Sequence, residues 1–468
     1  MPQALSERYL ILIAVRFGRL NLDSSSELLD SPSRRAEGSA FRGRGKTMLA
    51  RQSVRFTIAV LGVIACCYAF WNSGREGLST LLFSYASKAN QLDAADRAVA
   101  LSPSNPEAHY VRAGLLANKD ESAEANKEFE HAVALRPYDY VLWLELGRAR
   151  DRANDVERAI AAFGESVRLA PFYARPRWQL GNTLFRAGRR DEAFAELRRA
   201  ITSNPKLLPQ AIGLAWAAFS SDSEAVEEAL QPRTSSAHLA LASFLARHAR
   251  ASEAIAQFRS AGTLSSEQRR TLVADLLVSK NFAEAFEVWS SGRPTDGGGR
   301  SPSVAAIANG GFEQPILLDD PGFGWQLASD LKAARTSLDT TEPHMGVYSL
   351  RVDWSGDSDA SKAVISQLVL VEPKTRYRMT FAARTQDILT IGLPIVTVTD
   401  VTNNSERILG QSKNFAQGTS RWQNYAIEFA TTETTKALLI AIRRQNCAMT
   451  PCAAIGHAWV DDFQLEKI

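Results

Sequence analysis

The sequence carries none of the motifs that commonly mark an enzyme. Its six histidines form no H-E-x-x-H zinc motif, and neither a Walker loop nor a G-x-G-x-x-G fingerprint follows a strand pattern. The glycine run at 297–299 lacks the flanking strand and helix that a phosphate site needs. We therefore expect no catalysis and no catalytic cofactor. A glycan hydrolase stays as a remote alternative, because sequence cannot place the two opposed carboxylates that it would use.

The chain also lacks a large excess of charge of either sign. Its 54 basic and 51 acidic side chains leave a formal net charge of +3 in 468 residues. Nucleic-acid-binding domains usually carry a pronounced basic surplus. We therefore expect no nucleic-acid partner, and any cationic function must come from a local patch.

Cysteine is scarce, with four residues, and none has the spacing of a zinc site. Cys66 and Cys67 lie inside an apolar run, whereas Cys447 and Cys452 flank a short loop. A disulfide between Cys447 and Cys452 is one interpretation, provided that this part of the chain lies outside the cytoplasm. The other interpretation is two free thiols beside a β-turn.

Long uncharged runs are rare, and residues 56–71 form the one that approaches the length of a bilayer span. Tyr68 and Trp71 at its end suit a membrane interface, and the basic side chains nearby are concentrated before it. We predict a transmembrane anchor at 53–72, with membrane contact through residues 56–71. The predicted location is the bacterial inner membrane, single-pass, with the C-terminal domains in the periplasm.

Several alternatives remain open for this N-terminal part. Residues 63–66 loosely resemble a lipobox, so Cys66 is a candidate for lipidation after cleavage, and a buried helix outside any membrane is a third interpretation. Met48 precedes a compact basic-then-apolar pattern, so translation from Met48 instead of Met1 is also open. Residues 1–47 are rich in Ser, Arg and Gly, and we predict a disordered cytoplasmic segment over 1–52.

A 34-residue period follows the apolar run. Pro103, Pro137, Pro171 and Pro205 are each 34 residues apart, and each ends a helical pattern. Proline ends a helix because it lacks a backbone donor and disfavours helix at the preceding residue. Small and large apolar residues recur in the same register, at Ala125 and Phe129, Ala159 and Phe163, Ala193 and Leu197, and in the pairs Leu146-Gly147 and Leu180-Gly181.

This pattern resembles the tetratricopeptide repeat over residues 106–205. It predicts an all-α solenoid over 78–291, in which small residues let paired helices approach closely and the end units are atypical. The resemblance implies that protein partners bind a groove formed mainly by the first helix of each unit. Its predicted groove residues are Tyr110, Arg148, Arg152, Arg175, Trp178, Asn182 and Arg186.

The predicted groove is cationic and contains two aromatic residues. It suits an acidic peptide or an anionic glycan, through charge-assisted hydrogen bonds and stacking. The alternative is a solvated helix face whose arginines pair with acids such as Asp151 and Glu157. The Lys/Asn clamp that some family members use for chaperone C-termini is absent from these positions, which argues against a cytosolic co-chaperone.

After a predicted flexible linker at 292–305, the hydrophobic period changes to two. Leu350, Val352 and Trp354 alternate with Arg351 and Asp353, and similar alternation recurs at 377–381 and 425–429. Many short strands separated by turn signals predict an antiparallel β-sandwich.

Ordered motifs at 309–313, 324–325, 346–350, 373–377 and 460–463 make this part similar to the galactose-binding-like jelly roll of carbohydrate-binding modules, over 306–468. The resemblance implies a structural calcium, with Glu313 and Asp461 or Asp462 as ligands; an unmetallated polar cluster is the alternative. It also places Trp325, Trp422 and Phe463 in the core. Candidates for polysaccharide binding, on positions expected to point outward, are Gln367, Arg378, Arg384 and Arg443.

The sequence as a whole predicts a multidomain chain with a single transmembrane helix, an all-α tetratricopeptide-repeat solenoid and an all-β jelly-roll sandwich. The predicted function is a non-catalytic envelope scaffold that binds proteins through its repeats and glycan through its sandwich, in cell-envelope or exopolysaccharide assembly. A pure protein–protein assembly factor without glycan binding is the alternative.

Overall fold

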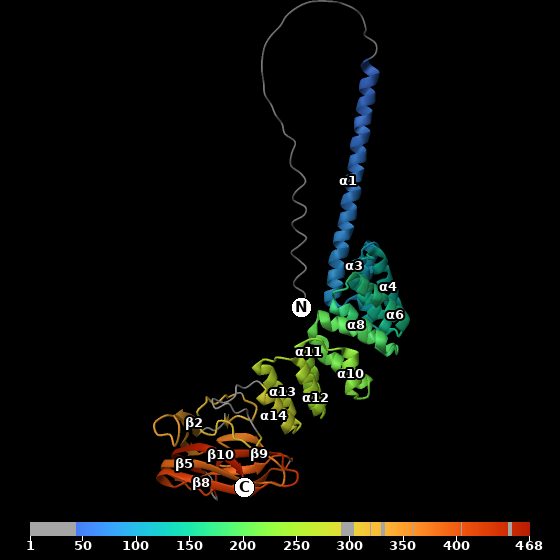
Figure 1. Cartoon of the computed structure of the whole chain (residues 1–468). Helices are drawn as coiled ribbons and strands as arrows, with labels where there is room; N and C mark the ends of the chain where they lie inside the picture. Colours follow the sequence, from blue (N-terminus) through green and yellow to red (C-terminus); the bar gives the residue numbers. More distant parts are fainter. Residues whose placement is uncertain are drawn as a thin grey trace, which may run out of the picture. The chain divides into compact units, whose positions relative to one another are not determined.

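The fold combines a helical repeat region with a β-sandwich, as predicted. In the described residues of this computed structural model, fourteen α-helices precede ten strands in two antiparallel sheets (Figure 1). The chain divides into two compact units, Met1–Leu78 and Ser79–Ile468. Residues 1–43 of the predicted disordered segment and 292–303 of the predicted linker lie outside the described residues, whereas the prediction of disorder is wrong for 44–52, which are helical. The structure describes residues 44–291, 304–318, 320–328, 333–357, 359–403, 405–447 and 452–468.

Helix α1 (Arg44–Ala89) contains the apolar run. Its segment Phe56–Ala89 is long and apolar enough to cross a membrane. The large apolar side chains of this run are exposed, and Phe56, Phe70 and Trp71 are 73%, 84% and 66% exposed. The helix does not end after Trp71, where the uncharged run ends, but continues through Gly74 and Gly77 to Ala89, since no proline interrupts it.

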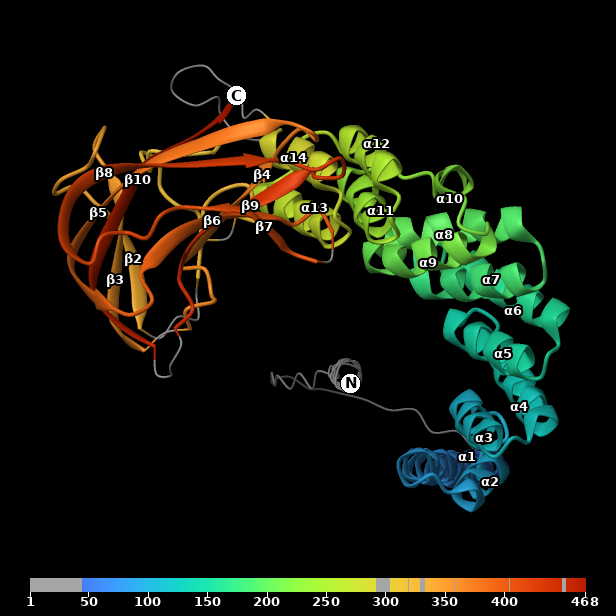
Figure 2. The same ribbon diagram turned by 90° about the horizontal axis from the view of Figure 1, so that it is seen from below.

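The second unit begins with helix pairs stacked in chain order. Residues 79–89 of α1 pack against α2 (Leu92–Leu101), where the Ser79 hydroxyl donates to Ala98 O at 2.8 Å and Ala86 shares a core with Ala94 and Ala95. The end of α1 and α2 therefore form the first helix pair of the solenoid. Figure 2 shows the pairs following one another up to α13 and α14. The further helices are α3 (Pro106–Asn118), α4 (Ser122–Leu135), α5 (Tyr140–Arg152), α6 (Val156–Leu169), α7 (Ala174–Arg186), α8 (Arg190–Ser203), α9 (Leu208–Ala218), α10 (Ser223–Leu230), α11 (Ser235–Arg247), α12 (Ala251–Ala261), α13 (Ser266–Val278) and α14 (Phe282–Ser290).

The 34-residue period is visible in the local geometry. Helices α2, α4, α6 and α8 each end two residues before a periodic proline. The turn inside a pair has a left-handed residue at Asp120, Asn154 and Gly188, again 34 residues apart. Gly147 is required by close approach, because a Cβ there would lie 2.6 Å from the Phe163 ring. The small residues therefore allow the helix contact that the sequence predicted.

The repeat becomes irregular after Pro205. A 3-10 turn, Pro205–Leu207, replaces the usual loop, and α9 and α10 have only 11 and 8 residues. Helix α10 ends at Gln231 in a left-handed conformation, with φ of 46°. Shortened helices cannot fill the space that a full pair would occupy, so the packing around this unit differs from that of its neighbours.

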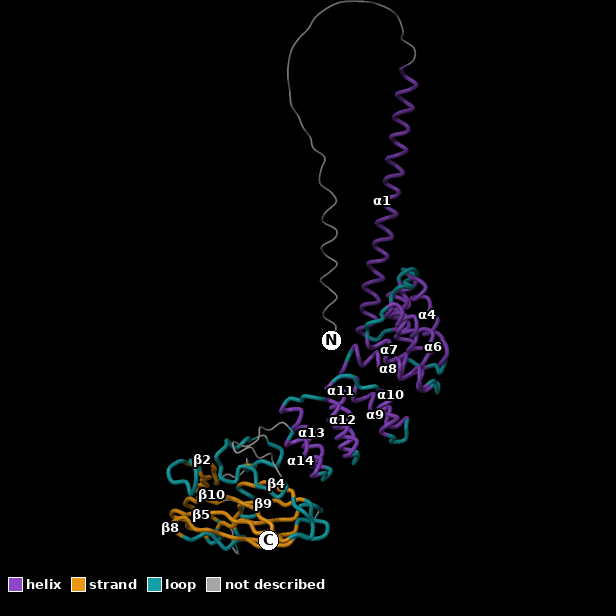
Figure 3. Tube along the Cα trace, viewed as in Figure 1, coloured by secondary structure: helices purple, strands orange, loops and turns teal. Residues whose placement is uncertain are grey.

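The C-terminal part is a sandwich of two five-stranded antiparallel sheets, coloured orange in Figure 3. The strand orders are β1-β4-β9-β6-β7 and β2-β3-β10-β5-β8. Trp325 and Phe463 are buried in the core between the sheets, as predicted. The strands are β1 (Gln326–Leu327), β2 (Ala334–Asp339), β3 (Ser349–Asp357), β4 (Ile365–Leu370), β5 (Arg376–Thr390), β6 (Pro394–Asp400), β7 (Arg407–Gln411), β8 (Gly418–Ala430), β9 (Ala437–Arg444) and β10 (Ala453–Lys467).

The sandwich covers the last helix pair of the solenoid. Phe323 and Leu370 from the sandwich side belong to the same apolar core as residues of α11 to α14. The indole Nε1 of Trp289 donates to both carboxylate oxygens of Asp320, each at 3.0 Å. Lys280 donates to the carbonyl of Val401 at 3.4 Å. The apolar end of the solenoid is thereby capped, which a terminal repeat requires.

Candidate binding surfaces

The predicted groove residues lie on the first helices of three successive pairs. Tyr110 is on α3, Arg148 and Arg152 are on α5, and the other four are on α7. Two of the groove residues contact their own solenoid. Trp178 packs against the apolar core, and Asn182 donates to Trp178 O at 2.8 Å. The cationic members therefore decide what this surface can bind.

Acidic residues pair with most of the groove arginines. Glu145 accepts from Arg148 at 3.0 Å through both oxygens and from Arg175 at 3.4 Å. Arg186 contacts Asp151 at 2.5 Å, as the solvated-face alternative anticipated.

That alternative also named Glu157, which lies 4.0 Å from Arg189 instead and pairs with none of the groove arginines. Sequence reasoning missed Glu145, although its position three residues before Arg148 on one helix was a usable signal.

A small cavity of about 270 Å³ adjoins this surface between α3 and α5. Tyr110, Phe129, Glu145 and Arg152 are among its lining residues. Burial raises the pKa of the Tyr110 hydroxyl, and Glu145 acts in the same direction. Arg152 forms no ion pair within the described residues. Four groove arginines face two acids, so the surface keeps an excess of positive charge beside a recess lined by both polar and apolar residues.

The sandwich carries a layer of arginine and tryptophan on the outer face of the β2-β3-β10-β5-β8 sheet. The Trp459 ring lies between two guanidinium groups, with centroid distances of 4.0 Å to Arg384 and 5.1 Å to Arg351. Arg384 also lies 5.7 Å from the Trp422 ring. A guanidinium above an aromatic face is a favourable cation–π arrangement.

Acidic and backbone groups hold this layer in place. Arg384 donates to Glu342 at 2.5 Å, and Trp422 Nε1 donates to Glu342 O at 3.2 Å. Trp459 Nε1 donates to Asp339 at 2.8 Å. Burial disfavours the charged form of Asp339, but hydrogen bonds from Thr341 and Trp459 outweigh burial and lower its pKa to about 2. Asp339 is therefore a firmly ionised partner of the layer.

The prediction that Trp422 is a core residue is wrong. Trp422 is only half-buried and lies on the outer face, with its ring 5.4 Å from that of His344. Trp459 was missed altogether, although strand alternation sets it opposite to the core residues Ala458 and Val460. Both tryptophans belong to the outer layer instead of the inter-sheet core.

The four candidate glycan-contact residues do not converge. Arg378 and Arg384 share the outer face of one sheet, and Arg378 pairs with Glu428 on the neighbouring strand at 2.5 Å. Arg443 is on β9 of the other sheet. The outward position expected for Gln367 is wrong, because Gln367 is fully buried and its amide exchanges hydrogen bonds with the backbone of Ala308 at 3.0 and 2.9 Å.

The physical reason for the error at Gln367 is that β4 is buried on both faces. Gln367 points inward with Ile365 and Val369, whereas Leu368 and Leu370 pack toward the last helix pair. A strand with apolar residues on both faces shows no usable alternation.

The three predicted calcium ligands lie around Gly311. A Cβ at Gly311 would be 3.7 Å from Asp462 Oδ1 and 3.9 Å from both Asp461 Oδ1 and Glu313 Cγ. Asp462 pairs with His344 at 2.5 Å. Burial raises the pKa of Asp461 to about 6. A fully buried carboxylate beside a second one is an environment that a cation would stabilise.

These carboxylates are also engaged by backbone donors. Glu313 accepts from the amides of Val347 and Tyr348 at 2.8 and 3.0 Å, and Asp461 accepts from the amide of His344 at 3.0 Å. Within the described residues, no group of three or more His, Cys, Asp or Glu side chains is arranged as a metal site. Calcium binding therefore stays a prediction.

Cys447 and Cys452 are joined by a disulfide, with 5.8 Å between their Cα atoms. The bond lies against the turn between β5 and β6, because a side chain at Gly392 would meet the Cys447 sulfur at 2.8 Å. Cys66 and Cys67 are free and exposed on α1. The cysteines thus fall into one structural pair and two thiols on the apolar helix.

The chain is similar to known proteins in its repeats. Residues 144–207 match the tetratricopeptide repeat family, and the repeats of this chain are of that type. No curated protein matches the chain.

Solved structures resemble parts of the chain at low identity. MamA from Desulfovibrio magneticus is 16% identical, covering 41% of this chain and 92% of that protein, with a TM-score of 0.27. YrrB, a TPR protein with an unusual peptide-binding site, is 17% identical over 46% of this chain and 89% of its own, with a TM-score of 0.27. A CBM4 structure is 13% identical over 35% of this chain and 99% of its own, with a TM-score of 0.26. Similarity at this level carries no argument about function.

Proposed function

We propose that this chain is a non-catalytic, membrane-anchored scaffold of the bacterial cell envelope that holds protein partners on its tetratricopeptide repeats. The observation that carries the proposal is the first-helix surface of α3, α5 and α7, where arginines outnumber acids beside a recess of mixed polar and apolar lining. Arg175 and Arg186 keep 63% and 55% of their side-chain surface exposed. Such a surface favours an acidic segment of a partner protein.

The partner test is a pull-down with the full-length protein from solubilised envelopes. Arg152→Glu combined with Arg175→Glu reverses charge at the groove, whereas Arg158→Glu reverses an exposed charge on α6, a second helix of its pair. We expect the groove variant to lose a partner that the wild type and the α6 variant both retain. Identical partner lists for all three proteins would contradict a role for the groove.

The anchor and the periplasmic location rest on α1. Its apolar side chains from Phe56 to Trp71 are exposed, an arrangement that suits lipid better than water. Fusions of a periplasm-active and a cytoplasm-active reporter after residue 300 test this location. Activity of the periplasmic reporter alone supports the proposal and agrees with the Cys447–Cys452 disulfide. Activity of the cytoplasmic reporter alone would make the repeats a cytosolic scaffold.

Glycan binding by the sandwich is a second proposed activity, in cell-envelope or exopolysaccharide assembly. The observation that favours it is the outer layer of Trp422, Trp459, Arg351 and Arg384. Trp459 is buried under the two arginines, so a sugar would contact the half-buried Trp422 ring and the guanidinium groups. A glycan array with wild type and Trp422→Ala tests this. If the wild type and Trp422→Ala bind the same glycans equally well, or if neither binds any glycan, the alternative of a pure protein–protein assembly factor would be favoured.

A structural calcium ion is proposed at the carboxylates around Gly311. Glu313, Asp461 and Asp462 would supply hard oxygen ligands and tie the first loop of the sandwich to its last strand. The melting temperature of the full-length protein is measured with excess calcium and with a chelator. We expect a rise with calcium at pH 7 that Asp461→Asn abolishes. An unchanged melting temperature would favour the hydrogen-bonded polar cluster without metal.

A further inference from the structure

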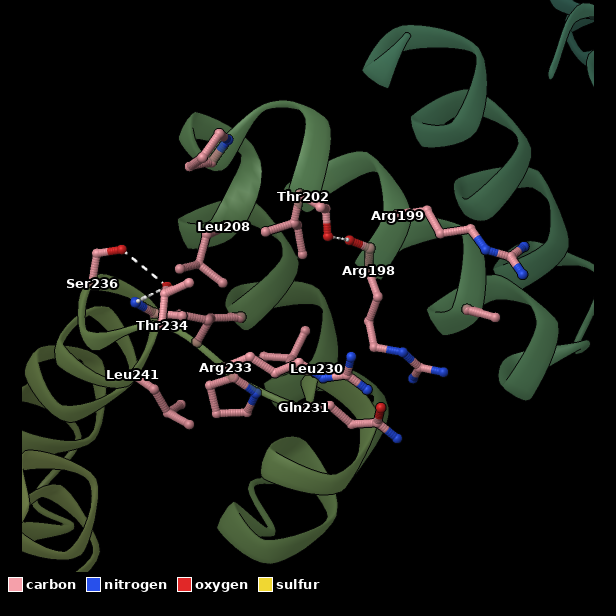
Figure 4. Close-up of a pocket in the computed structure, with 16 residues that line it drawn as sticks. Arg198, Arg199, Thr202, Leu208, Leu230, Gln231, Arg233, Thr234, Ser236 and Leu241 are labelled. Carbon is pink, nitrogen blue, oxygen red and sulfur yellow. Dashed lines mark hydrogen bonds between the residues drawn. The ribbon is translucent and has the colours of Figure 1, made fainter. Parts of the chain in front are cut away.

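A cavity of about 600 Å³ opens where the solenoid becomes irregular (Figure 4). Its walls come from the C-terminal half of α8, the start of α9, the segment after α10 and the start of α11. Since α8 is the second helix of its pair, this cavity is distinct from the first-helix groove. Its volume falls within the range of about 300–1,000 Å³ that is usual for ligand pockets.

The charged side chains that line this cavity are all basic. Arg198, Arg199 and Arg233 line it, and none of the described residues that line it is acidic. Burial lowers the pKa of Arg198, and the positive charges of Arg199 and Arg233 add to that effect. Arg199 pairs with Glu196 outside the cavity, whereas Arg233 forms no ion pair within the described residues. The cavity therefore holds positive charge that lacks a matching anion.

Beneath the arginines the wall is largely aliphatic. Leu208, Ile212, Leu230 and Leu241 are among the residues that line it, and Ile212 and Leu241 are each 1% exposed. Hydroxyl side chains from Thr202, Thr234 and Ser236 interrupt this wall, as Figure 4 shows. An occupant that matches both features carries an aliphatic group close to an anion and polar groups beside it.

We propose that this cavity binds a peptide segment of a protein partner in which an aliphatic side chain is flanked by carboxylates. The aliphatic side chain enters the cavity between α9 and α11, and the carboxylates contact Arg198 and Arg233. A fatty-acyl chain fits less well, because it carries a single carboxylate, whereas the cavity presents the positive charges of both Arg198 and Arg233.

The proposal adds a second binding site to the scaffold and does not depend on the groove. The irregular unit is what makes it possible, because a full-length helix pair would fill the space that shortened α9 and α10 leave open. Two separate sites on one solenoid allow one partner to contact both, or two partners to bind side by side.

The test measures fluorescence anisotropy of a labelled peptide, Ser-Glu-Leu-Leu-Asp-Glu, with the full-length protein in detergent. Two further peptides serve as references, one with Gln and Asn in place of the acids and one with Ser in place of both leucines. We expect saturable binding of the first peptide, and at least about tenfold weaker binding of each reference. Raising the salt concentration should weaken binding of the first peptide.

Variants locate the site. Arg198→Gln combined with Arg233→Glu is expected to weaken binding by about tenfold or more, and Ala237→Phe should do the same by filling the cavity. Arg190→Glu is the matched control, because Arg190 is an exposed arginine on the same helix α8 outside the cavity. Circular dichroism checks that each variant keeps its helix content.

Each other outcome overturns the proposal. Absence of peptide binding by the wild type would do so, as would equal weakening by Arg190→Glu, which would mean nonspecific attraction. Binding of laurate without binding of the peptide would assign the cavity to an acyl chain. The groove variant with Arg152→Glu and Arg175→Glu should bind the peptide normally; if it alone loses binding, the peptide occupies the groove.

Discussion

The solenoid and the sandwich use arginine in different ways. On the solenoid, groove arginines such as Arg148 and Arg186 lie beside carboxylates on the same or the next first helix. On the sandwich, Arg351 and Arg384 lie over the Trp459 ring, held there by acids from neighbouring strands and loops. The solenoid surface is an exposed ion-pair network that another charge can enter, whereas the sandwich layer is packed and partly buried.

The two regions also differ in how much of the structure depends on a single buried contact. Each helix pair of the solenoid contacts mainly its neighbours in the chain. From α1 to α8 the apolar core is divided into successive clusters, whereas from α8 onward a single cluster continues into the sandwich. The sandwich has one core between its two sheets, with residues from both ends of the domain. The loss of a buried side chain should therefore have local effects in the first half of the solenoid and affect the whole sandwich when it occurs there.

The largest expected effect comes from removing a buried ring in each region. Phe163→Ala in the solenoid and Phe381→Ala in the sandwich should each cost about 3–5 kcal/mol, because both rings are almost fully buried. Hydrogen exchange should show lost protection in α5 to α8 only for Phe163→Ala, and across both sheets for Phe381→Ala. Loss of protection in the sandwich on Phe163→Ala would contradict the comparison.

A pH-dependent change in stability is expected at Asp461 in the sandwich. The pKa of Asp461 is raised from 3.8 to about 6, so the folded state holds the proton more tightly than the unfolded state. This contribution lowers the free energy of unfolding by about 3 kcal/mol as the pH rises from below 4 to above 6. Subtracting the profile of Asp461→Asn from that of the wild type leaves the contribution of Asp461, including its repulsion by Asp462. A flat difference would contradict the raised pKa.

Alanine substitutions at two glycines of the solenoid should change the free energy of unfolding by smaller amounts, and the two changes should have opposite signs. Gly147→Ala should destabilise by about 1–3 kcal/mol, because the new Cβ would meet the Phe163 ring at 2.6 Å. Gly114→Ala on α3 should stabilise by up to about 1 kcal/mol, because nothing lies within 4 Å of its Cβ and alanine favours a helix. Chemical unfolding measures both; equal effects would refute close approach as the reason for Gly147.

The smallest expected changes in stability come from removing one arginine contact of each kind. Arg186→Ala should cost at most about 1 kcal/mol, since the ion pair with Asp151 is largely solvent-exposed. Arg384→Ala should cost about 1–2 kcal/mol, because its side chain is 14% exposed and covers an aromatic face. Tryptophan fluorescence should change only for Arg384→Ala. A greater cost at Arg186 would reverse the comparison between the two regions.

Much of the fold was predictable because its signals are local. Four prolines at 34-residue intervals and small residues in register define the helix pairs, and period-two alternation defines most strands. The limits of this approach appear where the environment on both sides of an element matters. Gln367 was placed outward because sequence cannot show that the last helix pair covers the other face of β4.

The binding surfaces were less predictable than the fold. The seven groove residues were placed on the correct helices, but Glu145 and its pairing with two arginines depended on the spacing between neighbouring pairs. Trp459 and Arg384 come together only through the register of β10 with β5. The cavity at α8 to α11 had one signal in the sequence, the loss of the 34-residue spacing after Pro205.

The sequence by itself determined the order of the parts: an apolar helix, tetratricopeptide repeats with their helix ends, and an antiparallel sandwich. These follow from proline, glycine and hydrophobic period, which act over a few residues. Tertiary structure alone decided which arginines are neutralised by acids, which tryptophans leave the core, and where a cavity opens. Those outcomes depend on distances between side chains far apart in the chain, and such distances exist only once the helices and sheets have packed.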